Sequence, residues 1–252
     1  MIKRFVKSFP ALHRALLPFV ERARSWKKAR RLERELARFR RHCLYLSRTI
    51  PEPMFVKVGA NDGIKGDPCS DILLAHRNWR GLLIEPVPYC FEKLRVNFSE
   101  PRFRLEQIAI GPVAGWATFY YVDEQAGKAL ALPEWFDQLG SFDRDHIVKH
   151  LDGILEPFIL EVKVEVCPMS EVLARNHVDE IQLLHIDTEG YDYEVLLTLD
   201  FSRYRPLLIF IEHKHLAENH RAGMRSLLHH HGYTIYECGG DYSAVYARWK
   251  AR

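Results

Sequence analysis

The hydrophobic pattern near the start of the chain predicts one long helix over residues 21–48. Its apolar residues recur at alternating intervals of four and three, a spacing that places them on one stripe of a helix. The stripe consists of Leu32, Leu36, Phe39, Cys43 and Leu46. Pro51 and Pro53 follow the helix and cannot continue it. We therefore expect two parts, a basic helical extension over residues 1–50 and a main domain over residues 51–252.

After residue 53 the pattern changes to short apolar runs separated by amphipathic stretches. The apolar runs predict strands, and the stretches between several of them have the periodicity of helices. The predicted strands are residues 54–59, 82–85, 103–110, 181–187, 207–212, 234–238 and 244–249. The predicted helices between them include residues 69–78, 89–98, 191–199 and 222–231. This alternation is typical of an α/β fold with a mostly parallel sheet covered by helices on both faces.

One gap between the predicted strands is longer than a single crossover helix requires. It contains residues 112–168, which we expect to form an insertion between the third and fourth strands. Two segments within it, residues 116–122 and 162–166, alternate apolar and polar side chains as strands do. Residues 123–158 between them are rich in turn-forming and aromatic residues. The segment either covers a pocket or is a surface excursion without a role.

The composition is that of a globular protein with an uneven charge. Hydrophobic residues make up 47% and aromatic residues 12% of the 252 residues, which suffices for a full core. The net charge of +3 combines a basic start with an acidic remainder. Residues 1–50 hold 15 Lys and Arg against 3 Asp and Glu, which leaves 21 against 30 in the rest of the chain. Such an asymmetry indicates an interaction segment.

The basic helix has three interpretations as an interaction segment. Its apolar stripe would pack on the main domain or on a second copy of the chain. Its charge would also suit an anionic membrane surface next to a lipid-linked substrate. Nucleic acid is the least favoured partner, because aromatic residues are few and no RNA-binding signature is present.

Cysteine usage and hydropathy indicate where the protein works. The chain has five scattered cysteines and no C-x-x-C pair, which is typical of a reducing compartment. No stretch of about 18 apolar residues occurs, so we expect no transmembrane helix. The predicted location is the cytoplasm, at the periphery of a membrane if the basic helix binds one.

Acidic residues gather where the predicted strands end. Four of the first five strands end at or next to a carboxylate, namely Asp62, Glu85, Asp187 and Glu212. The carboxyl ends of parallel strands meet at one edge of the sheet, and ligands of open α/β sheets bind beyond that edge. Stability alone does not require so many acids there, so the edge is the predicted binding site.

The loop after the first strand distinguishes between cofactors. A dinucleotide fold uses G-x-G-x-x-G, whose second glycine lets the backbone approach the pyrophosphate. Here Gly59 is followed by Asn61 at that position, and Asp62 adds a negative charge, which suits an amine or sulfonium better than a diphosphate. Glu85, 26 residues after Gly59, can accept hydrogen bonds from both ribose hydroxyls. A nucleoside with a cation and no phosphate describes S-adenosylmethionine.

Five short segments resemble, in order, the FkbM-type family of S-adenosylmethionine-dependent methyltransferases. They are residues 55–63 (FVKVGANDG), 81–86 (GLLIEP), 108–111 (IAIG), 186–192 (IDTEGYD) and 211–212 (IE). The resemblance covers about residues 54–215 and excludes the basic helix. It implies the class I methyltransferase fold, a Rossmann-like arrangement with a mostly parallel seven-stranded sheet. It also implies methylation of a hydroxyl oxygen on a sugar or a polyketide-like acceptor.

The resemblance assigns roles to the matching positions. The residues implied to wrap the methionine part of the cofactor are Gly59, Ala60, Asn61, Asp62 and Gly63. Glu85, followed by Pro86, would hold the ribose, and Ala109 would pack near the adenine. Asp187 would face the cofactor amine or the substrate.

Two residues depart from the family's pattern. Lys57 stands where many class I methyltransferases have an acid, and His185 stands where family members often have lysine. The amine of Lys57 could pair with Asp62 or Asp187, or could face a helix. The geometry of the amine site therefore stays open at this point.

Methyl transfer from a sulfonium is an in-line displacement, so the protein mainly aligns the acceptor with the cofactor. A hydroxyl acceptor must also lose its proton to a base. The predicted catalytic residues are Asp187, Glu212 and His213, and Glu189 and His215 are further candidates at the same edge. The competing mechanism is Mg²⁺ or Mn²⁺ bound by a mixed oxygen and nitrogen shell of Asp187, Glu189, Glu212 and His213. Because the sequence has no compact ligand motif, no metal site is predicted.

The sequence thus predicts a methyltransferase acting on a hydroxyl of a small-molecule or glycan acceptor. The alternatives are methylation at nitrogen or on a protein side chain, a non-catalytic scaffold with the methyltransferase fold, and a dinucleotide oxidoreductase. Asn61 and Asp62 disfavour the oxidoreductase. We expect removal of residues 1–48 to leave the cofactor affinity intact.

Overall fold

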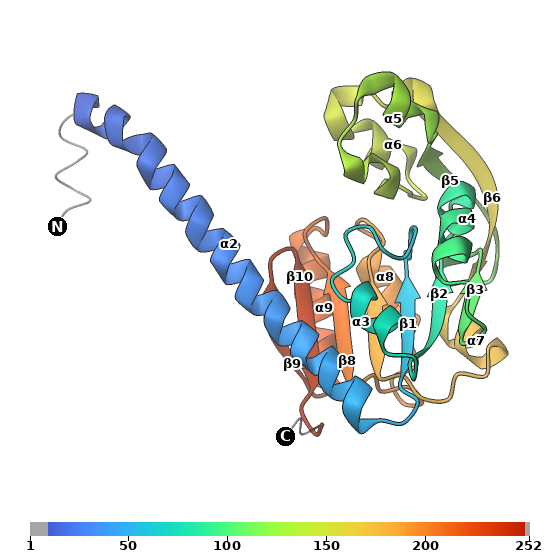
Figure 1. Cartoon of the computed structure of the whole chain (residues 1–252). Helices are drawn as coiled ribbons and strands as arrows, with labels where there is room; N and C mark the ends of the chain where they lie inside the picture. The colour runs from blue at the N-terminus through green and yellow to red at the C-terminus, as the bar shows by residue number, and fades with distance from the viewer. Residues whose placement is uncertain (1–9, 250–252) are drawn as a thin grey trace.

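The structure of the protein is a computed structural model that describes residues 10–249, so residues 1–9 of the predicted extension lie outside the described part. A seven-stranded sheet with the order β3-β2-β1-β7-β8-β10-β9 forms its centre (Figure 1). The strands are β1 (Met54–Val58), β2 (Arg80–Ile84), β3 (Phe103–Glu106), β7 (Leu183–Ile186), β8 (Leu208–Glu212), β9 (Tyr233–Cys238) and β10 (Asp241–Tyr246).

The sheet is mostly parallel, as the sequence predicts. Strands β3, β2, β1, β7 and β8 run parallel to one another, and β10 is antiparallel to both β8 and β9. The central strands β7 and β8 are buried at every position, because helices cover both faces. This arrangement confirms the predicted α/β class and the Rossmann-like seven-stranded sheet.

Two hydrophobic clusters hold helices against the two faces of the sheet. One cluster contains apolar residues of α7 (Met169–Arg175), α8 (Asp192–Leu197) and α9 (Glu218–His230). The other contains residues of α2 (Pro10–Thr49), α3 (Ser70–Ala75) and α4 (Pro88–Asn97). The carboxyl edge of the parallel strands stays free of these helices, and that edge carries the site.

Helix α2 joins the main domain through its C-terminal half. Phe39, Cys43 and Leu46 are fully buried in the second cluster, and the ring centroids of Phe39 and Phe210 lie 4.3 Å apart. Trp79 donates a hydrogen bond from Nε1 to Ser47 Oγ over 2.8 Å. The boundary expected near residue 50 therefore does not separate two independently packed parts, because this half of the helix covers one face of the sheet.

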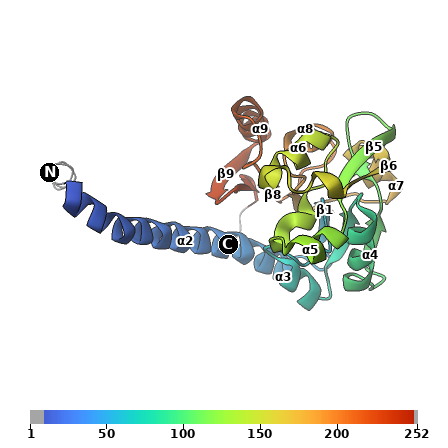
Figure 2. The same ribbon diagram turned by 90° about the horizontal axis from the view of Figure 1, so that it is seen from above.

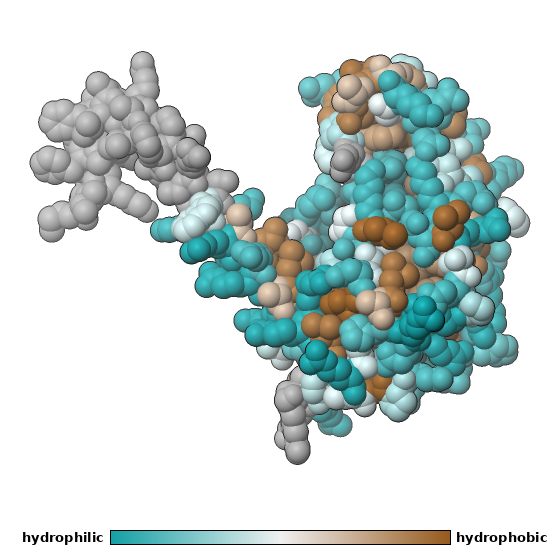
Figure 3. Space-filling view, in the orientation of Figure 1, coloured by the Kyte–Doolittle hydropathy of each residue, from teal (hydrophilic) through white to brown (hydrophobic). Residues whose placement is uncertain are grey.

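The preceding turns of α2 project away from the body (Figure 2). Leu32 is already 37% exposed, and the part of this segment that Figure 3 colours carries exposed hydrophilic side chains, among them those of Lys27, Lys28, Arg30 and Arg31. From Phe39 onward the apolar stripe packs on the chain's own sheet, so it is not available to a second copy. The described helices include none that combines the length and the apolar character needed to cross a membrane.

The predicted third strand is not continuous. Residues 103–106 form β3, whereas β4 (Ala109–Ile110) leaves the main sheet and pairs in parallel with β6 (Ile159–Cys167). Strand β5 (Gly115–Val122) pairs antiparallel with β6 and completes a second, three-stranded sheet. The expectation of one strand over residues 103–110 is therefore wrong, because the chain turns into the insertion two residues after β3.

The insertion continues above the carboxyl edge of the main sheet (Figures 1 and 2). Its short helices are α5 (Gln125–Leu130), η1 (Glu134–Gln138), α6 (Arg144–Val148), η2 (His150–Gly153) and η3 (Glu156–Phe158). They enclose a small core of their own that includes Phe136, Ile147 and Leu155. This core gives the segment a defined shape over the site.

Candidate functional site

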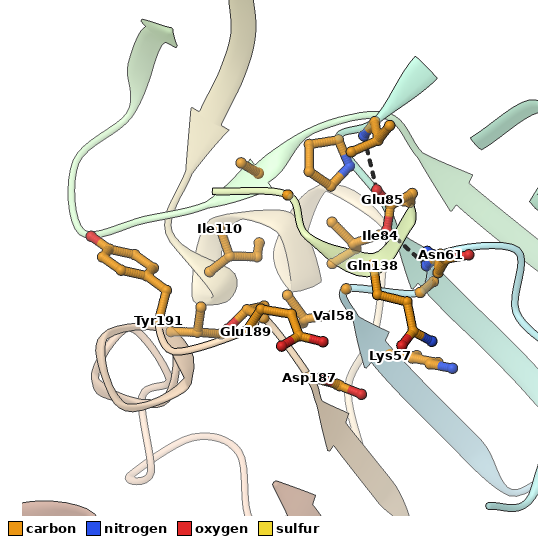
Figure 4. A pocket seen from close by; sticks show the side chains of 18 of the residues that line it. Lys57, Val58, Asn61, Ile84, Glu85, Ile110, Gln138, Asp187, Glu189 and Tyr191 are labelled. Atoms are coloured by element: carbon orange, nitrogen blue, oxygen red, sulfur yellow. Dashed lines mark hydrogen bonds between the residues drawn. The ribbon is translucent and has the colours of Figure 1, made fainter. Parts of the chain in front are cut away.

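A pocket lies between the carboxyl ends of β1, β2 and β7 and the insertion (Figure 4). Its empty space, including space open to solvent, is about 870 Å³. The predicted cofactor-binding residues that line it are Gly59, Ala60, Asn61, Glu85, Pro86, Ala109 and Asp187. The structure thus brings together residues that lie as far as 128 positions apart in the chain.

Gly59 allows three strand ends to meet at the floor of this pocket. Its φ is +74°, and a Cβ atom there would lie 1.7 Å from the backbone oxygen of Asp187. The amides of Gly59 and Ala60 both donate to the carbonyl oxygen of Ile84 at 3.0 Å. A side chain at position 59 would therefore push the loop after β1 away from β7.

Glu85 is held in place by the loop that it supports. Its side chain is buried, with 5% of the residue exposed, and its two oxygens accept hydrogen bonds from the amides of Asn61 (2.7 Å) and Val87 (2.9 Å) (Figure 4). Burial raises the pKa of the Glu85 carboxyl to about 7, although these two amides oppose the shift. Each oxygen keeps a further lone pair for a ligand in the pocket.

Asp62 and Gly63 do not line the pocket, contrary to their expected contact with a cofactor. The Asp62 carboxylate accepts hydrogen bonds from the amides of Ile64 (2.9 Å) and Lys65 (2.8 Å), so it closes the turn. A Cβ atom on Gly63 would lie 2.3 Å from the ring of Phe98. Both residues shape the loop from outside, because the chain has already turned away from the pocket at Asn61.

Lys57 and His185, the two departures from the family's pattern, lie side by side. They are register partners on the neighbouring strands β1 and β7, and both are buried. Asp67 joins them, with its Oδ2 2.5 Å from Lys57 Nζ and 3.4 Å from His185 Nδ1. The amine of Lys57 therefore pairs with neither Asp62 nor Asp187, and a third residue that the sequence analysis did not consider balances its charge.

Asp67 also organises the chain that follows it. Its Oδ1 accepts hydrogen bonds from the amides of Cys69 (2.7 Å) and Ser70 at the start of α3. Burial disfavours the charged form, but Lys57 and His185 outweigh it and hold the pKa of Asp67 well below its usual range. The same ion pair keeps the pKa of the buried Lys57 above its usual value despite desolvation.

Two further carboxylates lie at the ends of β7 and β8. The buried Oδ1 of Asp187 faces the pocket region without a hydrogen-bond partner in the described structure. Burial, followed by the charge of Glu189, raises the pKa of Asp187. Glu212 is 4% exposed, and burial together with the charges of Asp187 and Glu189 raises its pKa to about 9. Glu212 does not line the pocket but lies directly behind Asp187.

His213 points away from the pocket. Its ring stacks on Tyr242 with the centroids 3.9 Å apart, and its Nε2 lies 3.3 Å from Glu237. Burial lowers the pKa of His213. This placement does not support the catalytic role expected for it, because the chain turns after β8 and carries the ring to the side of β9 and β10. His215 lies at the site instead, with Nε2 3.1 Å from Glu189 Oε2.

The insertion covers the pocket. Of the two interpretations of this segment, a cover over a pocket and a surface segment without a role, the structure supports the first. Asp137 of η1 forms an ion pair with Lys65 at 2.9 and 3.0 Å, and its carbonyl oxygen accepts a hydrogen bond from Asn61 Nδ2 (3.2 Å). Phe119 and Gln138 line the pocket from the same side. Sequence reasoning missed these residues individually, since only the turn-rich, aromatic composition of the segment pointed to a cover.

Comparison with known proteins places this site in a family. The chain matches the family model of the methyltransferase FkbM domain over residues 57–235, which is more than half of its length. No curated protein matches it at a significant level. Among solved structures it is similar to precorrin-6y C5,15-methyltransferase from Geobacter metallireducens, with 11% identity and a TM-score of 0.41 over 81% of this chain and 83% of that chain. From the family match, which spans the loop after β1 and the ends of β2, β7 and β8, we conclude that this chain belongs to the FkbM methyltransferase family.

Proposed function

We propose that this methyltransferase uses S-adenosylmethionine to methylate a hydroxyl oxygen of a sugar, glycan or polyketide-like acceptor. The observation that carries the proposal is the position of Glu85. A buried carboxylate at the end of β2, fixed by two backbone amides and facing the pocket, matches the need of a ribose diol for a hydrogen-bond acceptor.

The surroundings of Glu85 suit the rest of this cofactor. Ile84, Val87 and Ile108 give the pocket an apolar wall against which an adenine ring can pack. Lys57 and Lys65 line the pocket, but each is paired with a carboxylate, so neither amine is free for a diphosphate. The charge balance favours a cationic sulfonium over a dinucleotide.

Asp187 is the residue that we propose as the proton acceptor. The bound cofactor would supply the methyl group and the leaving sulfur. Asp187 Oδ1 would take the proton of the acceptor hydroxyl as its oxygen receives the methyl group. Asp187 Oδ1 is buried and free of hydrogen bonds within the described structure, and its raised pKa makes the carboxylate a stronger base.

The cover over the pocket favours a small or extended acceptor over a folded protein. A protein side chain would be easiest to admit at a flat mouth, whereas here Asp137 and Gln138 lie over the loop after β1. Methylation at nitrogen is the second candidate, because the carboxylates at the site would also attract an amine. Turnover assays with matched hydroxyl and amine acceptors separate the two.

Replacing Glu85 by glutamine is expected to weaken binding of S-adenosylmethionine and S-adenosylhomocysteine about 10- to 100-fold. A hydrogen bond to a charged group contributes about 1.5–3 kcal/mol, and each 1.4 kcal/mol is about tenfold in affinity. Titration calorimetry measures the change, with the exposed Glu92→Gln as a matched control that should bind like the wild type. Unchanged affinity in a folded Glu85→Gln variant would refute the ribose assignment.

The affinity for S-adenosylhomocysteine is expected to depend on pH through Glu85. Ribose hydroxyls donate to the ionised carboxylate, so binding favours the charged form and is strong above the pKa of about 7. As the pH falls through 7, Glu85 becomes protonated and the affinity declines, by up to about tenfold per pH unit. Calorimetry from pH 5.5 to 8.5 tests this. The Glu85→Gln variant should lose the dependence, and a wild-type affinity that rises toward low pH would contradict the assignment.

A further inference from the structure

A second group of polar side chains lies behind the pocket, where β7 and β8 end. The group consists of Glu189, Glu212 and His215. Each offers one atom that could bind a metal, a carboxylate oxygen or an imidazole nitrogen, and these three atoms lie within 4.8 Å of one another. His215 Nε2 is 3.1 Å from Glu189 Oε2 and 3.9 Å from Glu212 Oε1. Two carboxylates and an imidazole therefore converge on a volume the size of a single ion.

The group leaves buried polar atoms without partners. Only 4% of the surface of Glu212 is exposed, and its Oε2 has no hydrogen-bond partner in the described structure. The adjacent Asp187 Oδ1 and His146 Nε2 are likewise buried and unpartnered. A buried carboxylate oxygen without a donor costs free energy, which a bound cation would recover.

The surroundings of the group are rich in carboxyl groups. Carboxyl groups of Asp187, Asp192 and Glu212 also bring oxygens within 4.8 Å of one another, and Asp241 is the register partner of Glu212 on β10. Lys214 places its amine 3.0 Å from Glu212 Oε1. The second oxygen of Glu212, Oε2, has no hydrogen-bond partner in the described structure, so it is left for a further cation.

We propose that Glu189, Glu212 and His215 bind a divalent transition-metal ion beside the pocket. Oxygen ligands alone would suit Mg²⁺ or Ca²⁺, whereas an imidazole beside two carboxylates suits Zn²⁺, which prefers nitrogen ligands, or Mn²⁺, which accepts both carboxylates and an imidazole. His146, from the insertion, lies near the same place, with its ring centroid 6.1 Å from that of His215. The insertion therefore lies close enough to enclose the ion from above.

The ion would face the acceptor. Glu189 and Asp187 line the pocket, while Glu212 and His215 stand behind them, so the ion lies next to the proposed proton acceptor. This role rests on the proposed methyl transfer to a hydroxyl. An acceptor oxygen bound to the ion loses its proton more readily, and a second oxygen of the acceptor can fix its orientation.

We expect the full-length protein, free of any affinity tag, to bind about one Mn²⁺ per chain in the absence of cofactor and acceptor. Electron paramagnetic resonance of free Mn²⁺ measures the binding, and Zn²⁺ competition extends it. Glu212→Gln and His215→Ala should each weaken Mn²⁺ binding at least about tenfold. Glu189→Gln serves the same purpose if one of these variants fails to fold.

The histidine run at the end of α9 offers a matched control. His229, His230 and His231 form a second place where histidines gather, at the C-terminal end of α9, whereas His215 precedes the start of this helix. Replacing His230 and His231 by alanine should leave Mn²⁺ binding unchanged. Loss of binding in that variant, or full binding in Glu212→Gln and His215→Ala, would overturn the proposal, as would an absence of binding in the wild type.

The same preparations separate this proposal from the proposed function. S-Adenosylhomocysteine binding without Mn²⁺ binding would refute the metal site alone. Mn²⁺ binding with the expected variant pattern, but no S-adenosylhomocysteine binding, would support the metal site and refute the cofactor assignment. Preferential binding of Mg²⁺ over Mn²⁺ would contradict the transition-metal assignment.

Discussion

Replacing Asp67 by asparagine is expected to lower the free energy of unfolding by about 3–5 kcal/mol. The substitution leaves the Lys57 amine buried without its anionic partner and removes the charge that faces His185. It also weakens the hydrogen bonds that the Asp67 carboxylate accepts from two amides at the start of α3. Urea denaturation of the full chain, followed by circular dichroism, measures the change.

An exposed ion pair on α3, the helix that follows Asp67, gives the control for this experiment. Asp71 pairs with Arg40 at 2.7 Å, but its side chain is 65% exposed. Asp71→Asn is therefore expected to cost at most about 1 kcal/mol. The double variant Lys57→Met/Asp67→Asn should recover part of the loss, because it removes the uncompensated charge. If Asp67→Asn and Asp71→Asn lowered the free energy of unfolding equally, the buried ion pair would contribute no more to stability than the exposed one.

Removal of residues 1–48 is expected to abolish cooperative folding. The cut deletes Phe39, Cys43 and Leu46, which are fully buried against one face of the sheet. Truncating one such buried side chain typically costs about 2–5 kcal/mol, and the whole domain is stable by only about 5–15 kcal/mol. This replaces the expectation from the sequence that the segment can be removed without consequence for cofactor affinity.

Replacing Lys27 and Lys28 by alanine provides the contrast. The side chains of residues 26–30 are exposed, so these substitutions should change the free energy of unfolding by no more than about 0.5 kcal/mol. This variant and the truncation are compared by thermal unfolding and by S-adenosylhomocysteine binding. A folded chain without residues 1–48 that binds the ligand normally would show that the α2 contacts contribute little.

The sequence by itself determined the family and the strands of the main sheet, apart from the end of the third strand. Buried parallel strands have continuous apolar runs, and their carboxyl ends meet at one edge of the sheet. The sequence alone therefore placed Gly59, Glu85 and Asp187 together, and all three line the pocket. These residues lie within or directly after strands, where local pattern fixes the direction of the chain.

Residues beyond the strand ends were placed less well. His213 follows β8 by one residue, yet its ring stacks on Tyr242 of β10, while His215 reaches Glu189. Past a strand end the two-residue alternation of side chains stops, and the direction of each side chain depends on the loop and its neighbours. The same limit applies to Asp62, whose carboxylate turns back to the amides of its own loop.

Only the tertiary structure showed which charged side chains pair with one another. Lys57 and His185 appeared in the sequence as two unrelated departures, but pairing of β1 with β7 sets them side by side, and Asp67 reaches them from the following loop. Likewise, the sequence left open whether the apolar stripe of α2 packs on the main domain or on a second copy, and the structure places it on the chain's own sheet. Charge pairing and burial are set by contacts between distant segments, and no local pattern in the chain encodes them.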